Sequence, residues 1–159
     1  MDTNSSLIEK FYTSFTQRIP GGMIACYSSK ITFNDPVFSL TGKRAGAMWH
    51  MFCEGGSDLE ISFGDVEADD RGGKARWEAR YTFSPTKRKV HNIIHAEFIF
   101  EDGLIVQHRD RFDFWRWSRM ALGPTGLALG WTPFVSKRIQ RAGVERLNRF
   151  VAAHPEYQE

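Results

Sequence analysis

In the first third of the chain, apolar residues recur at the three-to-four-residue spacing that is typical of amphipathic helices. The first such set consists of Leu7, Ile8, Phe11, Phe15 and Ile19. A capping-box pattern at Ser6–Glu9 precedes the next apolar turn, and Pro20 ends the set, so both ends of a helix are marked. The pattern predicts helices over about residues 6–18, 21–28 and 43–53, and a short strand at 31–34 that ends at Asp35-Pro36.

Beyond residue 57 the period changes from helical to two, which is typical of half-buried strands. The first alternating stretch begins at Leu59. The next two place on one face Ala75, Trp77, Ala79, Tyr81 and Phe83, and then Val90, Asn92, Ile94, Ala96, Phe98 and Phe100. Glu101-Asp-Gly103 is a tight hairpin signal that leads into a further strand. Long strands joined by short turns predict a curved antiparallel sheet.

The strand after this hairpin carries two polar residues on its apolar side. Alternation predicts that one face holds Leu104, Val106, His108, Asp110 and Phe112, while the other holds Gln107, Arg109, Arg111 and Asp113. A buried carboxylate is costly unless it is paired or hydrogen-bonded, so Asp110 is predicted to line a ligand pocket. The alternative is a register slipped by one residue, which would turn Asp110 toward an arginine of a neighbouring subunit. That slip would also expose Val106 and Phe112 to water.

The C-terminal quarter departs from the sheet pattern. Thr132-Pro133 marks the start of a helix that is predicted to end near Ala153. Four aromatic residues precede or begin this helix and predict packing on the outer face of the sheet or in a dimer interface, namely Trp115, Trp117, Trp131 and Phe134. No linker or repeat divides the chain, so we predict one domain over residues 1–159, with 115–159 as a helical extension.

Composition is ordinary for a globular protein and argues against several partners. Of the 159 residues, 42% are hydrophobic and 25% charged, and the aromatic share of 14% predicts a bulky core or an aromatic-lined cavity. A net charge of +2 is too small to indicate a nucleic-acid partner. The longest apolar stretch, about residues 121–135, is broken by glycines and prolines, so no membrane span is expected. Cys26 and Cys53 have no metal or redox spacing and the N-terminus has no signal-peptide pattern, which predicts a cytoplasmic protein.

Several short motifs follow one another in a recognisable order along the chain. They are Met23 to Tyr27, Phe33-Asn-Asp-Pro36, Gly42, Asp102-Gly-x-Ile105 and His108-x-Asp110. In this order the chain resembles the NTF2-like superfamily, and within it the SnoaL-like and ketosteroid-isomerase-like branch, over about residues 5–115. The resemblance implies an α+β, cone-shaped domain in which three N-terminal helices close a curved antiparallel sheet around a deep pocket. The C-terminal helix is an addition to that fold.

Only part of each known site in the superfamily carries over to this chain. Asp35 matches the general base of the steroid isomerases, but Phe11 and Ala96 stand where those enzymes need two oxyanion donors. Tyr12 is rotated by about 100° from the first of these positions. Each such donor is worth roughly 3–4 kcal/mol, so steroid isomerisation is not expected. His108-Arg-Asp110 matches the polyketide-cyclase branch better, where the aspartate acts as acid or base and the histidine orients it or binds substrate.

Two further chemistries fit less well. The epoxide-hydrolase branch uses an Asp-Arg-Asp arrangement, and alternation puts Arg80 on the wrong face for it. His91 and His95 lie on one strand about 13 Å apart, so they cannot share a metal ion. No other ligand cluster has a suitable spacing, and no glycine-rich phosphate loop or dinucleotide motif is present, so neither metal nor cofactor is expected.

The predicted site combines two catalytic candidates, Asp110 and His108, with a set of substrate contacts. The latter are Asn92, Tyr81, Trp77, Asp35, Trp49 and Phe112. Structural roles are the alternative: Asp before Pro is a common turn residue, Asn92 could form a polar bridge to Asp110, and aromatic side chains fill cores. Three hypotheses follow: a cofactor-free isomerase, cyclase or lyase acting on a small hydrophobic carbonyl compound, a non-catalytic binder of such a molecule, or a protein-interaction module. We also expect a homodimer.

Overall fold

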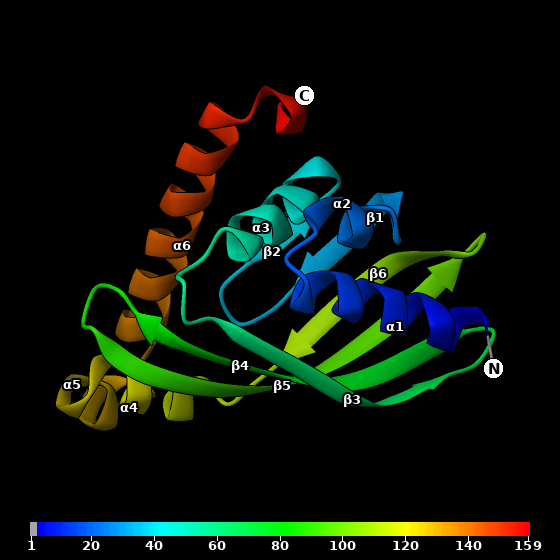
Figure 1. Ribbon diagram of the computed structural model, residues 1–159. Coiled ribbons are helices and arrows are strands. Elements are labelled where there is room, and N and C mark those ends of the chain that lie inside the picture. The colour runs from blue at the N-terminus through cyan, green and yellow to red at the C-terminus, as the bar shows by residue number, and fades with distance from the viewer. Residues whose placement is uncertain (1–2) are drawn as a thin grey trace.

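The computed structural model describes residues 3–159, in which helices cover one side of a curved sheet (Figure 1). The strands are β1 (Tyr27–Asn34), β2 (Ser39–Thr41), β3 (Glu60–Ala68), β4 (Gly72–Phe83), β5 (Arg88–Glu101) and β6 (Leu104–Arg111). The helices are α1 (Thr3–Thr16), α2 (Pro20–Ile24), α3 (Lys43–Cys53), α4 (Phe114–Leu122), α5 (Pro124–Leu129) and α6 (Pro133–Ala153), followed by the 3-10 turn η1 (Pro155–Tyr157). The predicted α+β fold is confirmed.

The six strands are ordered β2-β1-β6-β5-β4-β3. All neighbours pair antiparallel except β1 and β6, which run parallel. The prediction of an antiparallel sheet is therefore right for the long strands and wrong for this one pair. The parallel pair matters for the site, because it sets the end of β1 beside the polar half of β6.

The predicted ends of helices and strands agree best with the structure where a single residue marks the end. Helix α3 spans the predicted residues, and α6 begins after Thr132, whose side chain accepts a hydrogen bond from the Val135 amide. Helix α1 instead begins at Thr3, so the prediction that Ser6 starts it is wrong. The second helix is shorter than predicted because β1 already begins at Tyr27. Strand β2 was not predicted, since its three residues are too short to show a period.

A bulge in β6 corrects the predicted face of that strand. Ile99 pairs with Gln107 whereas Phe100 pairs with Ile105, so Val106 is an extra residue in the ladder. Ile105 is therefore fully buried, and Leu104 and Val106 are only half-buried. After the bulge the predicted alternation holds: His108 and Asp110 face the interior, while Arg109 and Arg111 face solvent.

The main core lies between the sheet and the helices α1 and α3, and it is rich in aromatic rings. A smaller cluster forms where α4 packs on β5, around Val90, Trp117 and Ala121. Helix α6 leaves that end of the sheet and passes alongside α3, so the C-terminus finishes close to α3 (Figure 1). Within residues 3–159, no helix is long and apolar enough to cross a membrane.

Candidate functional site

Asp110 and His108 form a buried pair on the inward face of β6. His108 Nε2 lies 2.9 Å from Asp110 Oδ1, and the two side chains are 0% and 2% exposed. Burial of a carboxylate disfavours its charged form unless a donor compensates it, and His108 is that donor. Among the described residues, no other side chain donates to Asp110, so the carboxylate keeps oxygen lone pairs for a further partner.

Two more residues continue this hydrogen-bonded chain into the core. Trp49 Nε1 donates to the Tyr27 hydroxyl at 2.7 Å, and that hydroxyl lies 2.7 Å from His108 Nδ1. Burial, with the Asp110 charge contributing, raises the pKa of Tyr27 well above its usual value, so the phenol keeps its hydrogen. Only one arrangement satisfies every member: Tyr27 donates to Nδ1 of a neutral His108, and Nε2–H of that ring donates to Asp110. The chain therefore fixes the tautomer of His108.

The parallel pairing of β1 and β6 brings a second carboxyl group to this centre. Asn34 is paired with Arg109, so the next residues along the two strands are Asp35 and Asp110. Burial raises the pKa of Asp35 to about 7; hydrogen bonds from the Phe38 and Val37 amides oppose the shift, and the Asp110 charge adds to it. Asp35 has the predicted role of a turn residue, while its role as a base stays a prediction. It closes a turn through its Oδ1, and it is a carboxyl group that titrates near neutral pH.

Helix α6 helps to bury the Asp35 turn. Gln140 Nε2 donates to the Pro36 carbonyl at 3.0 Å. Gly143 allows the close approach, because a Cβ there would lie 2.9 Å from Val37 and 3.2 Å from Phe38. The C-terminal extension therefore packs over one edge of the centre.

Two buried aromatic donors in the core have no partner among the described residues. They are the Tyr12 hydroxyl and Trp77 Nε1, whose rings lie 6.1 Å apart. Burial and then the Asp110 charge raise the pKa of Tyr12 well above its usual value, so its hydroxyl is a donor close to that carboxylate. Unsatisfied buried donors cost roughly 1–3 kcal/mol each, and in native proteins they often mark a place where a ligand or water binds.

The sequence pattern predicts that Tyr12 points away from the site, but in the structure its side chain is buried in the core. Phe11 and Tyr12 are both fully buried, because α1 is covered by the sheet on one side and by α3 on another. Phe11 packs against His108, while Tyr12 stacks on Phe63. The signal that could have found Tyr12 is its spacing of four residues from Ile8, which extends the apolar stripe. Tyr27 was missed because it was assigned to the end of a helix.

Of the remaining predicted substrate contacts, some lie close to the Asp110–His108 pair and others lie far from it. Trp49 stacks on His108 with ring centres 5.7 Å apart, and Trp77 packs beside Trp49 at 5.9 Å. Phe112 continues the inward face of β6 and is half-buried. Asn92 is buried on β5, but Asp110 pairs with Ala96, four residues or about 13 Å along that strand. A direct Asn92–Asp110 bridge is therefore wrong.

Tyr81 lies still farther from Asp110, toward α4. Its hydroxyl accepts a hydrogen bond from Trp117 Nε1 at 2.8 Å, and burial raises its pKa. This contact joins β4 to the C-terminal extension, so Tyr81 has a structural partner outside the polar centre.

Aromatic rings surround the polar centre closely. Phe98, Phe33 and Phe11 lie 4.4, 5.0 and 5.5 Å from the His108 ring. Two surface hollows, of about 660 and 570 Å³, lie elsewhere: one among Lys87–Lys89, Arg116 and Arg119, the other along the β3–β4 turn. Neither is lined by Asp110 or His108.

The family of the chain follows from its sequence as well as its fold. The family model of the SnoaL-like domain matches residues 8–108. The chain belongs to the SnoaL-like family. This match confirms the predicted family and ends two residues before Asp110. No curated protein matches the chain.

Solved structures with the same fold belong to proteins of different activities. An LEH-like epoxide hydrolase from M. tuberculosis aligns with a TM-score of 0.63 and 18% identity over 79% of this chain and 92% of that one. A proposed SnoaL-like polyketide cyclase from Jannaschia sp. CCS1 aligns with a TM-score of 0.66 and 13% identity over 77% and 93%. A protein with a ketosteroid isomerase-like fold from Catenulispora acidiphila, solved with trimethylamine, gives 0.64 and 9% over 80% and 97%. At these identities the likeness shows the fold alone.

Among residues 3–159, one group of side chains that could bind a metal ion lies outside this centre. His50, Glu54 and His154 offer atoms within 4.8 Å of one another. Spacing along the sequence could not reveal this group, because its third residue, His154, lies about a hundred residues from the other two.

Proposed function

We propose that this SnoaL-like protein is a cofactor-independent acid/base enzyme that acts on a small hydrophobic carbonyl compound. The observation that carries the proposal is the buried Asp110–His108 pair. Hydrogen bonds through Tyr27 and Trp49 fix the tautomer of the His108 ring. A positioned carboxylate of this kind transfers a proton at a carbon next to a carbonyl, the step that isomerases, cyclases and lyases share.

In the proposed mechanism each polar group around Asp110 has a separate role. Asp110 removes the proton next to the substrate carbonyl, while His108 holds the carboxylate in place. The carbonyl oxygen, which gains negative charge, accepts hydrogen bonds from Tyr12 and Trp77, the two unpartnered donors. Asp35, with its pKa of about 7, exchanges a proton with the substrate or with Asp110. Because the rings around His108 are closely packed, substrate entry requires some of them to move.

In the proposal, the remaining predicted contacts bind the rest of the substrate. Asn92 has no side-chain partner among the described residues, and in the proposal it binds a polar group at the far end of the substrate. Phe112 and Trp49 contact the apolar body of the substrate, and Tyr81, which is hydrogen-bonded to Trp117, bounds the space that the substrate occupies. The proposal places the protein in the cytoplasm, where the free, buried Cys26 and Cys53 stay reduced.

A ligand screen on matched variants tests the proposal. Lipophilic ketones, steroids and polyketide-like aromatics are screened by thermal shift against wild type, Asp110→Asn and the control Asp70→Asn, which lies in the exposed β3–β4 turn. A ligand at about a hundred times its dissociation constant adds roughly 2.7 kcal/mol, a shift of several degrees. Hits are then incubated with each protein, and products are identified by mass spectrometry and NMR.

We expect Asp110→Asn to lose roughly 10²–10⁴-fold in turnover while keeping its fold, and Asp70→Asn to keep full turnover. Equal turnover by Asp110→Asn and wild type would reject Asp110 as the acid or base. Saturable binding without any product would instead make the protein a non-catalytic binder.

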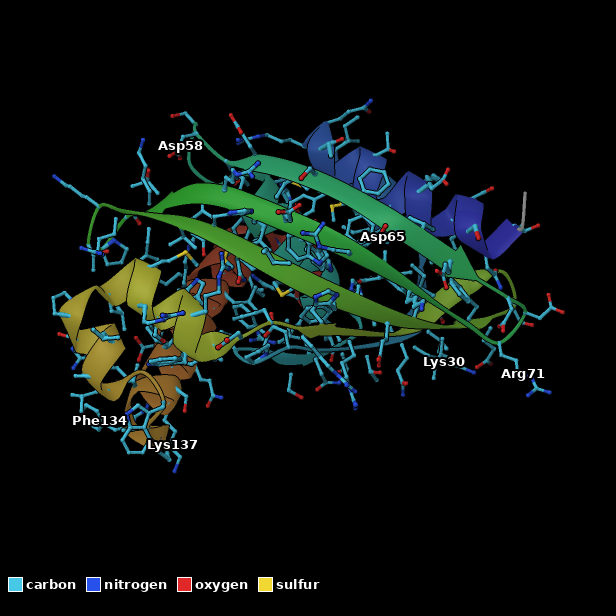
Figure 2. The ribbon with its side chains drawn as sticks, turned by 90° about the horizontal axis from the view of Figure 1, so that it is seen from below. Lys30, Asp58, Asp65, Arg71, Phe134 and Lys137 are labelled. Carbon is cyan, nitrogen blue, oxygen red and sulfur yellow. The ribbon has the colours of Figure 1, made fainter. Side chains whose placement is uncertain are left out.

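A second candidate, a protein-interaction role, is supported by exposed apolar residues at the α5–α6 end. Trp131 and Phe134 are 71% and 68% exposed, and Leu127 and Leu129 are 57% and 45% exposed. Phe134 projects outward from this end, far from Arg71 at the opposite end of the sheet (Figure 2). Exposed aromatic groups of this kind favour an interface. We propose that a second copy of the chain covers them in a homodimer.

A further inference from the structure

The ends of α3 and α6 bring together three side chains that commonly bind transition metals. His50 lies on the last turn of α3, Glu54 follows the last residue of that helix, and His154 follows the last residue of α6. Their ligand atoms lie within 4.8 Å of one another. None of the three belongs to the polar centre around Asp110.

The His154 ring is held in the orientation that a ligand needs. Its Nδ1 lies 2.7 Å from the Phe150 carbonyl oxygen. A carbonyl only accepts, so Nδ1 carries the hydrogen, and the neutral ring keeps its lone pair on Nε2. The ring also stacks on Phe150, with centres 3.9 Å apart and planes 16° apart. Metal-binding histidines are usually oriented in this way, by a hydrogen bond from the ring nitrogen that does not bind the metal.

The His50 ring has an equivalent partner. Its Nδ1 lies 2.8 Å from the Tyr157 hydroxyl, and its Nε2 lies 3.1 Å from Glu54 Oε1. With Nδ1–H donating to Tyr157, Nε2 is left to bind a metal together with the Glu54 carboxylate. Both partner residues, Phe150 and Tyr157, come from the C-terminal extension.

The geometry is close to that of a tetrahedral site. Metal–ligand bonds of about 2.0–2.2 Å place neighbouring tetrahedral ligands about 3.3–3.5 Å apart. His50 Nε2 and Glu54 Oε1 lie 3.1 Å apart, slightly closer than this spacing, and the His154 ring nitrogen lies within 4.8 Å of both, so small side-chain movements bring the three atoms to tetrahedral positions. The side chain of Glu54 is 57% exposed and that of His50 is 19% exposed, which leaves the fourth position open to water.

We propose that His50, Glu54 and His154 bind a divalent transition-metal ion of the zinc class, which fastens the C-terminal extension to α3. Two imidazole nitrogens and one carboxylate oxygen are a ligand set that suits Zn²⁺. Because α6 also packs over the Asp35 turn, the ion stabilises one wall of the polar centre without contacting it.

The test uses untagged full-length protein freed of metal by chelation. Zn²⁺ binding is measured by isothermal titration calorimetry, and the melting temperature is followed with and without Zn²⁺. Co²⁺ is added separately, because a four-coordinate Co²⁺ site gives intense visible absorption. His50→Ala and His154→Ala remove ligands. His91→Ala is the control, since His91 pairs with Glu78 at 2.7 Å in a similar way but belongs to no three-ligand group.

We expect one Zn²⁺ per chain, a rise of several degrees in melting temperature and Co²⁺ absorption in wild type and His91→Ala. Substitution of a residue that only hydrogen-bonds to a metal ligand typically lowers metal affinity 10–100-fold. His50→Ala and His154→Ala remove a ligand itself, so each should lower the affinity for Zn²⁺ by more than that. Their melting temperatures without metal report whether they fold. A Tyr157→Phe variant, which keeps all three ligands, should bind Zn²⁺ more weakly than wild type. The proposal is overturned if wild type binds no Zn²⁺ or if folded His154→Ala binds it as tightly as wild type.

Discussion

Asp110 is buried on β6, whereas Asp35 is half-buried directly after β1, the strand that runs parallel to β6. The partners of the two carboxyl groups differ. Asp110 accepts from a histidine whose tautomer is fixed, whereas Asp35 accepts from two backbone amides through Oδ1. Burial with these partners leaves Asp35 with a pKa of about 7. Paired carboxyl groups in different environments are a common way to provide an acid and a base at one site.

The titration of Asp35 predicts a specific dependence of stability on pH. Its folded pKa of about 7 lies above the usual 3.8, so its contribution to stability is complete below about pH 4. That contribution is lost as the pH rises through 7. Asp35→Asn keeps the amide contacts but does not titrate. We therefore expect the free energy of unfolding of wild type, relative to Asp35→Asn, to fall between about pH 4 and 7 in urea titrations. Parallel curves for the two proteins would contradict the shift.

Tyr12 and Tyr27 are both buried phenols, but only Tyr27 has hydrogen-bond partners. Tyr12→Phe removes an unpartnered donor, so the ligand-free variant should be at least as stable as wild type. Tyr27→Phe leaves Trp49 Nε1 and His108 Nδ1 without a partner and should cost about 1–3 kcal/mol. Urea denaturation measures both. If Tyr12→Phe also weakens binding of a carbonyl ligand, its hydroxyl acts on that ligand; a loss of stability equal to that of Tyr27→Phe would argue against this role.

At the scale of elements, one arginine joins α1 to the loop between α3 and β3. The Arg18 guanidinium donates to carbonyl oxygens of Cys53, Gly55, Gly56 and Leu59, at 3.5, 3.1, 3.0 and 3.0 Å. A planar group with five donors suits such a ring of carbonyls. This contact fixes the position of α1, which carries Phe11 and Tyr12, relative to the sheet.

Arg18→Lys should therefore destabilise the protein, because an ammonium group cannot reach all four carbonyls. We expect a loss of about 2 kcal/mol, measured from the midpoint of urea denaturation. Arg71→Lys is the control, since Arg71 lies exposed at the tip of the β3–β4 turn (Figure 2). A similar effect of both substitutions would show that the carbonyl contacts do not stabilise the fold.

The accuracy of the sequence predictions varied between elements for physical reasons. Strands β4 and β5 alternate without interruption, and their inward residues are the predicted ones. Strand β6 contains a bulge, which alternation cannot detect, so Ile105 replaces Leu104 and Val106 on the inward face. Helix α4 begins directly after Asp113, whose side chain caps it by accepting a hydrogen bond from the Arg116 amide.

At the scale of the whole molecule, the α5–α6 end exposes several apolar residues to solvent. In the proposed homodimer they are covered by a second copy of the chain. Light scattering coupled to gel filtration should give twice the chain mass for wild type. Trp131→Glu combined with Phe134→Glu should give a monomer.

Ile19→Glu serves as the control for this experiment, because Ile19 is 48% exposed but lies beyond the end of α1. It should remain dimeric. A monomeric wild type at working concentrations would reject the homodimer, and a dimer that survives the double substitution would place the interface elsewhere.

The sequence by itself determined the α+β class, the SnoaL-like family and the inward position of Asp110 and His108. These depend on local periodicity and short motifs, which are properties of contiguous residues. Tertiary structure decided which distant residues meet. The parallel pairing of β1 with β6 sets Asp35 beside Asp110, Tyr27 fixes His108, and the return of α6 to α3 joins His154 to His50. Each contact crosses more than seventy residues of chain, a separation over which spacing along the sequence carries no information about distance in space.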